Sequence, residues 1–268
     1  MVVAITGGAR GIGLATAKRL AASGARIAVG DIDEAALEQA QREIAGTVLA
    51  RRLDVRDEQS FADFLQAAVD EFGGLDVLVN NAGIMPVGPL LEESGDVARR
   101  MFDINVHGVL IGTKLAVPLL AGRPGARVVN LASYAGKLPV PGQVSYAGTK
   151  AAVLAITDAS RWEFESRGVG FTVIIPTFTK TELITGTTTP KSVVPIEPDD
   201  VARAIQRAIE NGNDEIYVPK ALKPFGRALG ILPRRWHNAI HRRLGTDRAF
   251  IDVDREDRKA YLDRTESL

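Results

Sequence analysis

Short apolar runs that alternate with longer helix-like segments constrain the fold of this chain more than any other feature. Several runs are rich in valine and isoleucine and lack strict polar alternation, which is typical of strands buried on both faces of a parallel sheet. The runs span residues 2–6, 26–30, 47–54, 75–80, 126–132, 169–176 and 215–218. Because strand–helix alternation indicates βαβ units, the sequence predicts an α/β fold with a doubly wound parallel sheet of the Rossmann type, in a single domain.

Between the runs, apolar residues recur at three- and four-residue spacing, as on the buried face of a helix. Residues 14–21 and 61–69 show this pattern. No repeat or linker interrupts the alternation before about residue 220, and the charge pattern changes after it. We therefore divide the chain into a main domain over residues 1–220 and a basic, amphipathic C-terminal extension over residues 221–268.

Charge and composition argue against several classes of function. The 33 basic and 33 acidic residues balance, so no bulk positive field attracts nucleic acid. The absence of cysteine excludes disulfides, thiolate metal ligands and cysteine nucleophiles, and three histidines without ligand-like spacing argue against a metal site. No stretch reaches the roughly 18 apolar residues of a membrane span, and no signal peptide opens the chain. We therefore expect a cytoplasmic protein.

A glycine-rich turn, TGGARGIG at residues 6–13, directly follows the first predicted strand. Gly7, Gly11 and Gly13 let the backbone turn tightly and approach a phosphate, and the next helix offers free N–H groups and its positive dipole end. The spacing differs from the general G-x-G-x-x-G fingerprint, so a turn without a ligand is the alternative. Its place between strand and helix favours a dinucleotide site, which also includes Arg10 and Ile12.

Asp31 ends the second predicted strand, 18 residues after the last glycine of the turn, close to the offset of a ribose-binding acid. A carboxylate there accepts hydrogen bonds from the ribose hydroxyls and repels a 2′-phosphate, so it favours NAD over NADP. Two alternatives stay open. Asp31 could cap a strand or helix end, a role for which Asp33 competes, or Arg10 could pair with a 2′-phosphate. Asp54 and Val55 end the third strand, where the adenine edge would lie.

Further motifs follow this turn in an order that identifies a family. They are Asp54-Val55, NNAG at residues 80–83, Asn105, Ser133, YAGTK at residues 146–150, and Pro176 with Thr181. Together with TGGARGIG, they make the sequence resemble the short-chain dehydrogenase/reductase family from its first residues to about residue 218. The resemblance implies hydride transfer between a nicotinamide cofactor and a secondary alcohol or ketone.

Four residues match the catalytic set of that family. Tyr146 would be the general acid/base on the substrate oxygen, which Ser133 would hydrogen-bond. Lys150, on the same helix face as Tyr146, would lower its pKa and bind the nicotinamide ribose, and Asn105 would hold a water of a proton relay. A tyrosine with an ordinary pKa of about 10 is a poor base at neutral pH, so we expect the ammonium and the nicotinamide ring to favour its phenolate. Each residue taken alone also has a purely structural interpretation.

The resemblance extends the cofactor site to Asn81, Ala82, Gly83, Tyr146, Lys150, Pro176 and Thr181. The segment at residues 80–83 lies against the cofactor in the family and also braces the central sheet, so a mainly structural role stays open. Thr181 matches a threonine near the nicotinamide carboxamide. Thr177 stands where the family has glycine, so this end of the pocket is expected to be tighter or differently shaped.

Residues 182–198 contain three prolines and a glycine, and they indicate a long mobile loop that shapes the substrate pocket. Its apolar residues suggest an apolar, bulky alcohol such as a steroid, a terpenoid or a lipid. These residues are Leu183, Ile184, Val193, Val194 and Ile196.

Residues 221–245 carry six lysines and arginines and no acid, beside an apolar stripe at helical spacing. The stripe consists of Leu229, Leu232, Trp236, Ile240 and Leu244. Three interpretations are open: a helix packed on the body or on a partner subunit, a helix on an anionic membrane surface, and a wall of the substrate pocket. The acids within residues 247–257 weaken the membrane interpretation by offering the arginines internal partners. His237 and His241 are interpreted as part of the basic face.

We therefore predict that the domain over residues 1–220 binds NAD and a small-molecule alcohol or ketone. An NADPH-dependent carbonyl reductase that uses Arg10 and a non-catalytic NAD-binding sensor are the alternatives. The resemblance implies a homodimer or homotetramer with contacts through residues 94–120 and 146–167. Peripheral membrane contact through residues 221–245 is an open prediction, and no nucleic-acid partner is expected.

Overall fold

One parallel seven-stranded sheet forms the centre of the protein in the computed structural model, which describes residues 1–190, 193–224, 226 and 233–266. The strand order is β3-β2-β1-β4-β5-β6-β7. The strands are β1 (Val2–Thr6), β2 (Arg26–Asp31), β3 (Val48–Arg52), β4 (Val77–Asn80), β5 (Arg127–Leu131), β6 (Gly170–Pro176) and β7 (Glu215–Val218). All seven predicted strands are present with bounds within two residues of the prediction, and the predicted Rossmann-type fold is confirmed.

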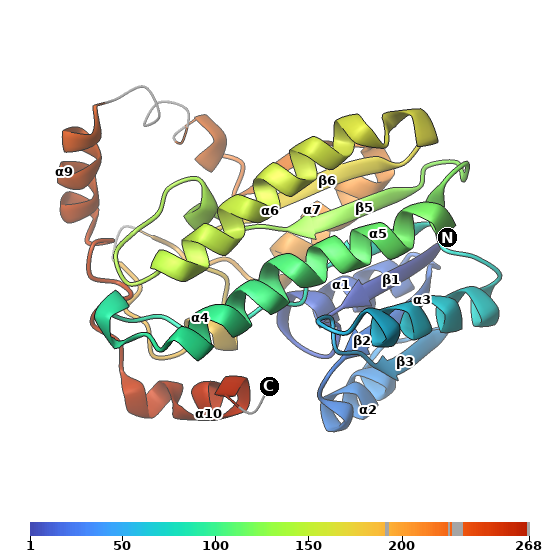
Figure 1. Ribbon diagram of the computed structural model, residues 1–268, viewed down its shortest axis with the longest axis horizontal. Coiled ribbons are helices and arrows are strands. Elements are labelled where there is room, and N and C mark those ends of the chain that lie inside the picture. Colours follow the sequence, from blue (N-terminus) through green and yellow to red (C-terminus); the bar gives the residue numbers. More distant parts are fainter. Residues whose placement is uncertain (191–192, 225, 227–232, 267–268) are drawn as a thin grey trace.

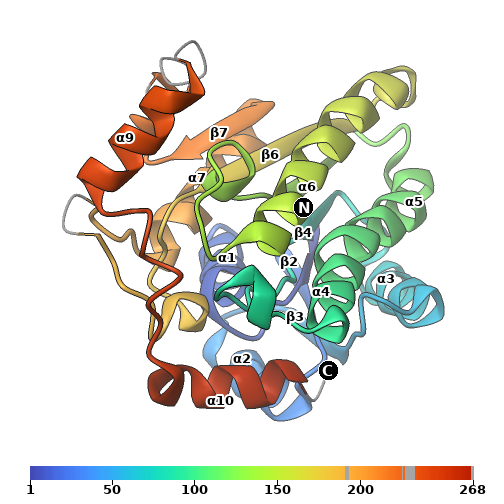
Figure 2. The ribbon, with the colours of Figure 1, turned by 60° about the vertical axis from the view of Figure 1, so that its left-hand side comes forward.

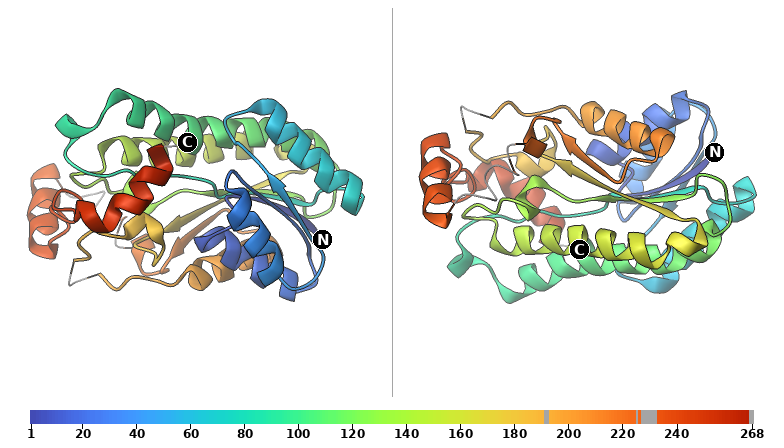
Figure 3. Two further views of the ribbon diagram at one scale, coloured as in Figure 1. Left: turned by 90° about the horizontal axis from the view of Figure 1, so that it is seen from below. Right: turned by 90° about the horizontal axis from the view of Figure 1, so that it is seen from above.

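Helices cover both faces of the sheet, as the buried strands require. Helices α1, α2 and α7 lie on one face and α3, α5 and α6 on the other (Figure 1 and Figure 3). The helices are α1 (Gly11–Ala22), α2 (Glu34–Glu43), α3 (Glu58–Phe72), α4 (Gly95–Phe102), α5 (Gly108–Leu120), α6 (Val144–Glu163), α7 (Pro198–Asn211), α9 (Arg234–Leu244) and α10 (Arg255–Glu266).

The direction of the connections reverses between β1 and β4, the two central strands. From β1 the chain proceeds to β2 and β3 on one side, and from β4 it proceeds to β5, β6 and β7 on the other. The carboxyl ends of β1 and β4 therefore face a crevice that no connection crosses, which is where open α/β sheets bind ligands.

A buried polar ladder fixes the two strands beside that crevice. The amide of Asn80 on β4 donates to the Asn130 side chain on β5 at 2.9 Å, and Asn130 donates to Thr157 Oγ1 on α6 at 2.9 Å. Because all three side chains are buried and hydrogen-bonded, a register slip between β4 and β5 would leave unpaired polar groups. This is the structural role that the sequence left open for Asn80.

The C-terminal extension is not a single basic helix. Figure 2 shows α9 at the periphery of the molecule and α10 along its lower edge. Between the two helices, Ala249 and Phe250 are buried in the main core, so this part packs on the body. The prediction for His241 is wrong, because its ring is buried and its Nδ1 lies 2.7 Å from Thr246 Oγ1. Trp236 is half exposed, and the stripe residues Leu229 and Leu232 lie outside the described residues.

Within the described part of the chain, no helix has the length and hydropathy needed to cross a membrane.

Candidate active site

A pocket of about 610 Å³ opens at the carboxyl ends of the central strands. It brings together residues that lie more than 170 positions apart in the sequence, from Gly7 to Thr181. Its lining includes the predicted residues Gly7, Arg10, Gly11, Ile12, Asp31, Asp54, Val55, Asn81, Ala82, Gly83, Ser133, Tyr146, Lys150, Pro176 and Thr181. Gly13 and Asn105 do not line this pocket. They lie behind it and hold its wall, as described below.

The glycine turn has a backbone that only glycine adopts easily. Gly7 and Gly11 have φ angles of +61° and +52°, in the left-handed region. A Cβ atom on Gly13 would lie 2.1 Å from the Gly7 carbonyl oxygen, so a side chain there would displace the turn. The Asn81 amide donates to the carbonyl oxygens of Thr6 and Gly7 at 2.9 and 2.8 Å and fixes the turn from the other side.

The N-terminus of α1 faces the pocket just after this turn. Arg10 is its N-cap residue, and within the described residues no side chain caps the free N–H groups there. Uncapped N–H groups, the positive helix dipole and a close backbone approach together suit a pyrophosphate. The turn therefore fits a dinucleotide.

Asp31 presents its carboxylate to the pocket from the end of β2. Its oxygens accept hydrogen bonds from the backbone N–H groups of Ala9 at 3.2 Å and Asp33 at 3.3 Å. Burial raises the pKa of Asp31, and those backbone hydrogen bonds and the charge of Arg10 oppose that rise. Asp31 is thus held in place by the glycine turn itself, and its other lone pairs are available to a ligand.

One ion pair bears on the two alternatives that involved Asp33 and Arg10. Asp33 is the N-cap of α2 and accepts from Ala36 N at 2.9 Å, and it pairs with the Arg10 guanidinium at 2.8 Å. The cap role therefore belongs to Asp33. Arg10 is already neutralised, and a phosphate beside Asp31 would face two carboxylates and one arginine.

Asp54 also lines the pocket, at the β3 side. It forms an ion pair with Arg56 at 2.7 Å, and the hydrogen bond from Arg56 lowers the pKa of Asp54. Val55 is buried beside it.

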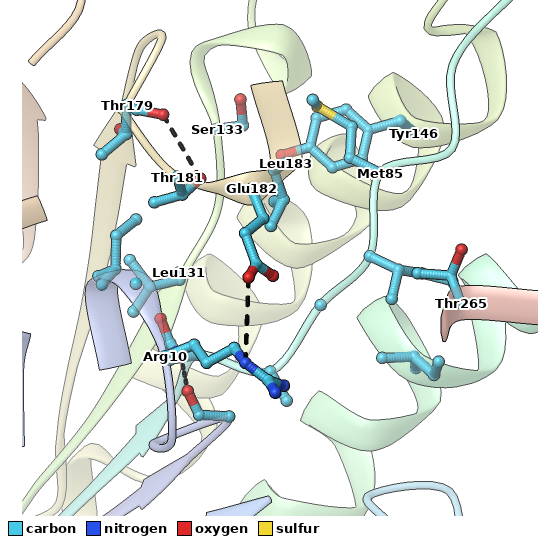
Figure 4. Close-up of a pocket in the computed structure, with 18 of the residues that line it drawn as sticks. Arg10, Met85, Leu131, Ser133, Tyr146, Thr179, Thr181, Glu182, Leu183 and Thr265 are labelled. Atoms are coloured by element: carbon cyan, nitrogen blue, oxygen red, sulfur yellow. Dashed lines mark hydrogen bonds and ion pairs between the residues drawn. The ribbon is translucent and has the colours of Figure 1, made fainter. Parts of the chain in front are cut away.

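Tyr146 and Ser133 meet at the other end of the pocket, where α6 passes the end of β5 (Figure 4). A hydrogen bond with Ser133 lowers the pKa of Tyr146, but burial raises it by more, and the net result is a pKa well above the ordinary value. The Lys150 ammonium is not among the groups that lower it, and because Tyr146 is only 6% exposed, the tyrosine keeps its proton at neutral pH in the cofactor-free structure. The expectation that this ammonium and the nicotinamide ring together favour the phenolate stays a prediction.

Lys150 lies one helical turn after Tyr146, with its Nζ 5.8 Å from the centre of the tyrosine ring. The ammonium donates to the Leu131 carbonyl oxygen at 2.8 Å. Burial lowers the pKa of Lys150 from 10.5 to about 8. At neutral pH the group is therefore mostly charged.

The buried ammonium of Lys150 should destabilise the cofactor-free protein, and Lys150→Met should therefore stabilise it. The fall in pKa from 10.5 to about 8 corresponds to about 3 kcal/mol of destabilisation by the buried charge, which the substitution removes. The variant also loses the hydrogen bond to Leu131, which offsets about 1 kcal/mol of that gain. We expect a melting temperature about 4–8 °C higher at pH 7. Calorimetry on the wild type and the variant, with the exposed Lys114→Met as control, measures this.

The difference in stability between Lys150→Met and the wild type should decrease as the pH rises above about 8. Between the folded pKa of about 8 and the unfolded value of 10.5, the unfolded chain binds more protons than the folded chain. The free energy of unfolding of the wild type therefore rises with pH in this window, and the advantage of the variant shrinks. A variant that is less stable than the wild type at pH 7 would contradict the argument.

Asn105 braces the pocket wall and does not enter it. It lies in a π-helical turn over Asp103–His107, a kind of irregularity frequent at functional sites. Its carbonyl accepts from Ile84 N at 2.9 Å, and its amide donates to Ile84 O at 2.9 Å and to Thr149 Oγ1 at 3.1 Å. The side chain thus joins the loop after β4 to α6 next to Lys150. Its role in a proton relay stays a prediction.

The predicted substrate loop contributes only part of what we expected. Leu183 and Ile184, in a 3₁₀ turn over Glu182–Ile184, line the pocket. The prediction is wrong for the other apolar residues of the loop. Val194 is 83% exposed, Ile196 packs against the core beside α1 and α7, and Val193 is not part of the lining.

Residues of the C-terminal extension that the sequence did not indicate close the pocket. They are Phe250, Tyr261, Arg264 and Thr265, the last three on α10. The Phe250 ring stacks on Phe178 with centroids 5.1 Å apart. The one available sequence signal is a short apolar stretch at residues 260–262 within an otherwise charged segment. The pocket-wall interpretation was for residues 221–245, but none of the described residues in that range lines the pocket, and residues 250–265 supply the wall instead.

A chain of ion pairs ties this wall to the glycine turn. Glu182 lies 4.0 Å from Arg10 (Figure 4). It also pairs with Arg264 of α10. Since Arg10 also pairs with Asp33, four charged side chains connect the start of α2, the turn, the loop and α10. The two ends of the pocket are thereby held together. No cluster of potential metal ligands was found among the residues that the structure describes.

The sequence is similar to known dehydrogenases over much of its length. Residues 1–191 match the family model described as short chain dehydrogenase. The chain is 40% identical over 178 residues to 2,5-dichloro-2,5-cyclohexadiene-1,4-diol dehydrogenase of Sphingobium indicum, which covers 65% of this chain and 71% of that protein. It is 36% identical to cis-4-hydroxycyclohexanecarboxylate dehydrogenase of Sinomonas cyclohexanicum, with 69% and 76% covered.

Among solved structures, a short-chain dehydrogenase/reductase from Burkholderia phymatum in complex with NAD superposes with a TM-score of 0.77. It is 27% identical, and the match covers 84% of this chain and 91% of that one.

Proposed function

The chain belongs to the short-chain dehydrogenase/reductase family and is an oxidoreductase acting on CH–OH groups, and on that premise we propose that it oxidises alicyclic secondary alcohols with NAD. One observation carries the proposal. A single pocket joins an uncapped helix N-terminus and a ribose-type carboxylate, Asp31, to Ser133 and Tyr146 with Lys150 beside the tyrosine.

The residues at the first end of the pocket would hold the cofactor. Gly7, Gly11 and the N–H groups of α1 would hold the pyrophosphate, and Asp31 the adenosine ribose. When bound, NAD supplies the acceptor for the hydride that leaves the carbinol carbon.

The residues at the second end would hold and deprotonate the alcohol. Ser133 would hydrogen-bond the substrate oxygen and place it against Tyr146, which takes the hydroxyl proton in oxidation and returns it in reduction. Because burial keeps Tyr146 protonated in the cofactor-free protein, positive charge near its oxygen is needed to form the phenolate. Lys150 would supply such a charge below its pKa of about 8, since its Nζ lies 5.8 Å from the centre of the tyrosine ring.

The lining of the pocket and the names of two relatives support a ring-shaped alcohol. Around Tyr146, the wall consists largely of apolar side chains from four parts of the chain. They are Ile84, Met85, Leu138, Phe178, Leu183, Ile184 and Phe250. Two relatives are named for the oxidation of hydroxyl groups on six-membered carbon rings. We therefore narrow the predicted steroid, terpenoid or lipid substrates to alicyclic alcohols with an apolar body.

Preference for NAD over NADP should depend on Asp31. In parallel calorimetric titrations, we expect the wild type to bind NADH at least tenfold more tightly than NADPH. Asp31→Ala should weaken NADH binding by about tenfold, which corresponds to the loss of one charge-assisted hydrogen bond. It should also reduce the ratio of the NADH affinity to the NADPH affinity. Asp70→Ala, which removes an exposed carboxylate on α3, is the control of equal charge. An unchanged preference in Asp31→Ala would refute the assignment, and tighter NADPH binding by the wild type would support a reductase.

The predicted homodimer or homotetramer, with contacts through residues 94–120 and 146–167, stays a prediction, as does contact of residues 221–245 with a membrane surface.

A further inference from the structure

A second tyrosine faces the pocket that holds Tyr146. Tyr261, on α10, is 5% exposed and lines the pocket together with Ser133 and Tyr146. The electrostatic effect of Tyr261 contributes to the raised pKa of Tyr146. The matched family segment ends at residue 191, and Tyr261 therefore lies in a part of the chain that the family model does not cover.

The hydroxyl of Tyr261 has a proton to donate and no acceptor for it. Its oxygen accepts a hydrogen bond from the backbone N–H of Met85 at 2.6 Å. A phenol is also a donor, and among the described residues no acceptor lies within hydrogen-bond distance of its proton. Burial raises the pKa of Tyr261 to about 12, so the proton is present at any working pH. A buried donor without a partner is costly, which points to a ligand atom.

Two arginines hold the Tyr261 ring in place. The Arg258 guanidinium lies 5.0 Å and the Arg264 guanidinium 5.7 Å from the ring centre. Arg258 is completely buried and donates to the carbonyl oxygens of Leu183 at 3.1 Å, Thr185 at 2.7 Å and Met85 at 3.0 Å. Met85 is therefore bound twice by α10, because the Tyr261 hydroxyl accepts from its N–H and the Arg258 guanidinium donates to its carbonyl oxygen. These two hydrogen bonds fix the position of the hydroxyl before a ligand arrives.

The charges around Tyr261 favour an acceptor with negative charge density. Arg264 pairs with Glu182, but within the described part of the chain no carboxylate pairs with Arg258. Its Nε is also buried without a partner among those residues. An uncompensated guanidinium behind the phenol strengthens the phenol as a donor and stabilises an oxygen acceptor in front of it.

We propose that Tyr261 is a second hydrogen-bond donor of the substrate pocket and selects alcohols that carry another oxygen acceptor, a hydroxyl or a carboxylate, away from the reacting carbon. The inference rests on the proposed function and names the substrate class of the same site. The apolar wall holds the body of the substrate, Ser133 and Tyr146 hold the reacting hydroxyl, and Tyr261 holds the distal oxygen.

The test compares Tyr261→Phe with the wild type on three alcohols of one ring size, with NAD as cofactor. Cyclohexanol has no second oxygen, cyclohexane-1,4-diol has a neutral one and 4-hydroxycyclohexanecarboxylate a charged one. The phenylalanine keeps the ring and its contacts with both arginines. We expect kcat/KM of the variant to fall by about tenfold or more for the two bifunctional alcohols, mainly through KM, and to stay within twofold for cyclohexanol. A larger fall for the carboxylate than for the diol would identify the charged substrate.

Tyr217→Phe is the matched control, because Tyr217 is also nearly buried but bonds Glu215 outside the pocket. It should leave all three values within twofold. An equal fall of all three in Tyr261→Phe would mean that the hydroxyl acts only by holding Met85, and no fall would mean that it touches no substrate. Either result overturns the inference and leaves the proposed function standing. A wild type that oxidises none of the three alcohols would overturn the proposed function, and this inference with it.

Discussion

Tyr146→Phe is expected to lower kcat for alcohol oxidation by about 10³-fold, while NADH binds with unchanged affinity. The substitution removes only the hydroxyl oxygen, so the buried ring still fills its place on α6 and the cofactor end of the pocket is untouched. General acid–base catalysis by a positioned group contributes about 10²–10⁴-fold to a rate. We expect the middle of this range, because among the described residues of the pocket Tyr146 is the titratable group that lies beside Ser133.

Single-turnover kinetics with saturating NAD measure the chemical step directly, and fluorescence titration with NADH shows whether the pocket is intact. Tyr217→Phe, which removes a hydroxyl elsewhere in the fold, should retain full activity. If Tyr146→Phe keeps more than a tenth of the wild-type rate, another group moves the proton, and the nearby hydroxyl of Tyr261 would be the first to remove in a double variant. If no alcohol is oxidised by the wild type and NADH still binds, the non-catalytic sensor becomes the better interpretation.

The parts of this protein that the sequence predicted are those set by neighbours along the chain. Apolar runs such as residues 2–6 and 126–132 are buried on both faces wherever they lie in the sheet, so their composition predicts strands. The sequence also predicted the glycine turn, because its requirements are local: a left-handed backbone at Gly7 and Gly11 and no Cβ atom at Gly13. The positions of Ser133, Tyr146 and Lys150 followed from a family motif.

What the sequence did not predict depends on contacts between distant segments. Tyr261 bonds Met85, 176 residues earlier, and no local pattern announces such a pair. The raised pKa of Tyr146 has the same origin, since the depth of burial follows from the packing of the whole wall and not from the four-residue spacing to Lys150. Val194 shows the opposite error, because an apolar residue in a loop is as readily exposed as buried when no periodicity constrains it.

Gly13→Ala is expected to weaken NADH binding by about 10²-fold, the second-largest effect we predict. The new Cβ would lie 2.1 Å from the carbonyl oxygen of Gly7 and 2.6 Å from the Asn81 amide nitrogen. The first neighbour is backbone, so the clash cannot be relieved by rotating a side chain. The turn must move and lose its hydrogen bonds to Asn81, and with them the geometry that suits a pyrophosphate. Overpacking of this kind costs about 1–3 kcal/mol of stability, so we also expect a melting temperature lower by roughly 3–10 °C.

Gly148→Ala is the control for Gly13→Ala, because it also replaces a glycine by alanine but lies outside the glycine turn. Gly148 is exposed on α6, and a Cβ there would meet only a Phe102 ring atom at an ordinary 3.6 Å. It should leave NADH affinity unchanged and raise stability by up to about 1 kcal/mol, because alanine is the better helix former. Calorimetric titration with NADH and thermal unfolding of both variants decide the matter. A Gly13→Ala protein that is destabilised but binds NADH as tightly as the wild type would contradict the prediction. It would mean that the exact conformation of the turn matters for packing and not for binding the pyrophosphate. A loss of affinity at a temperature where the variant is fully folded would instead place the phosphate contact at this backbone.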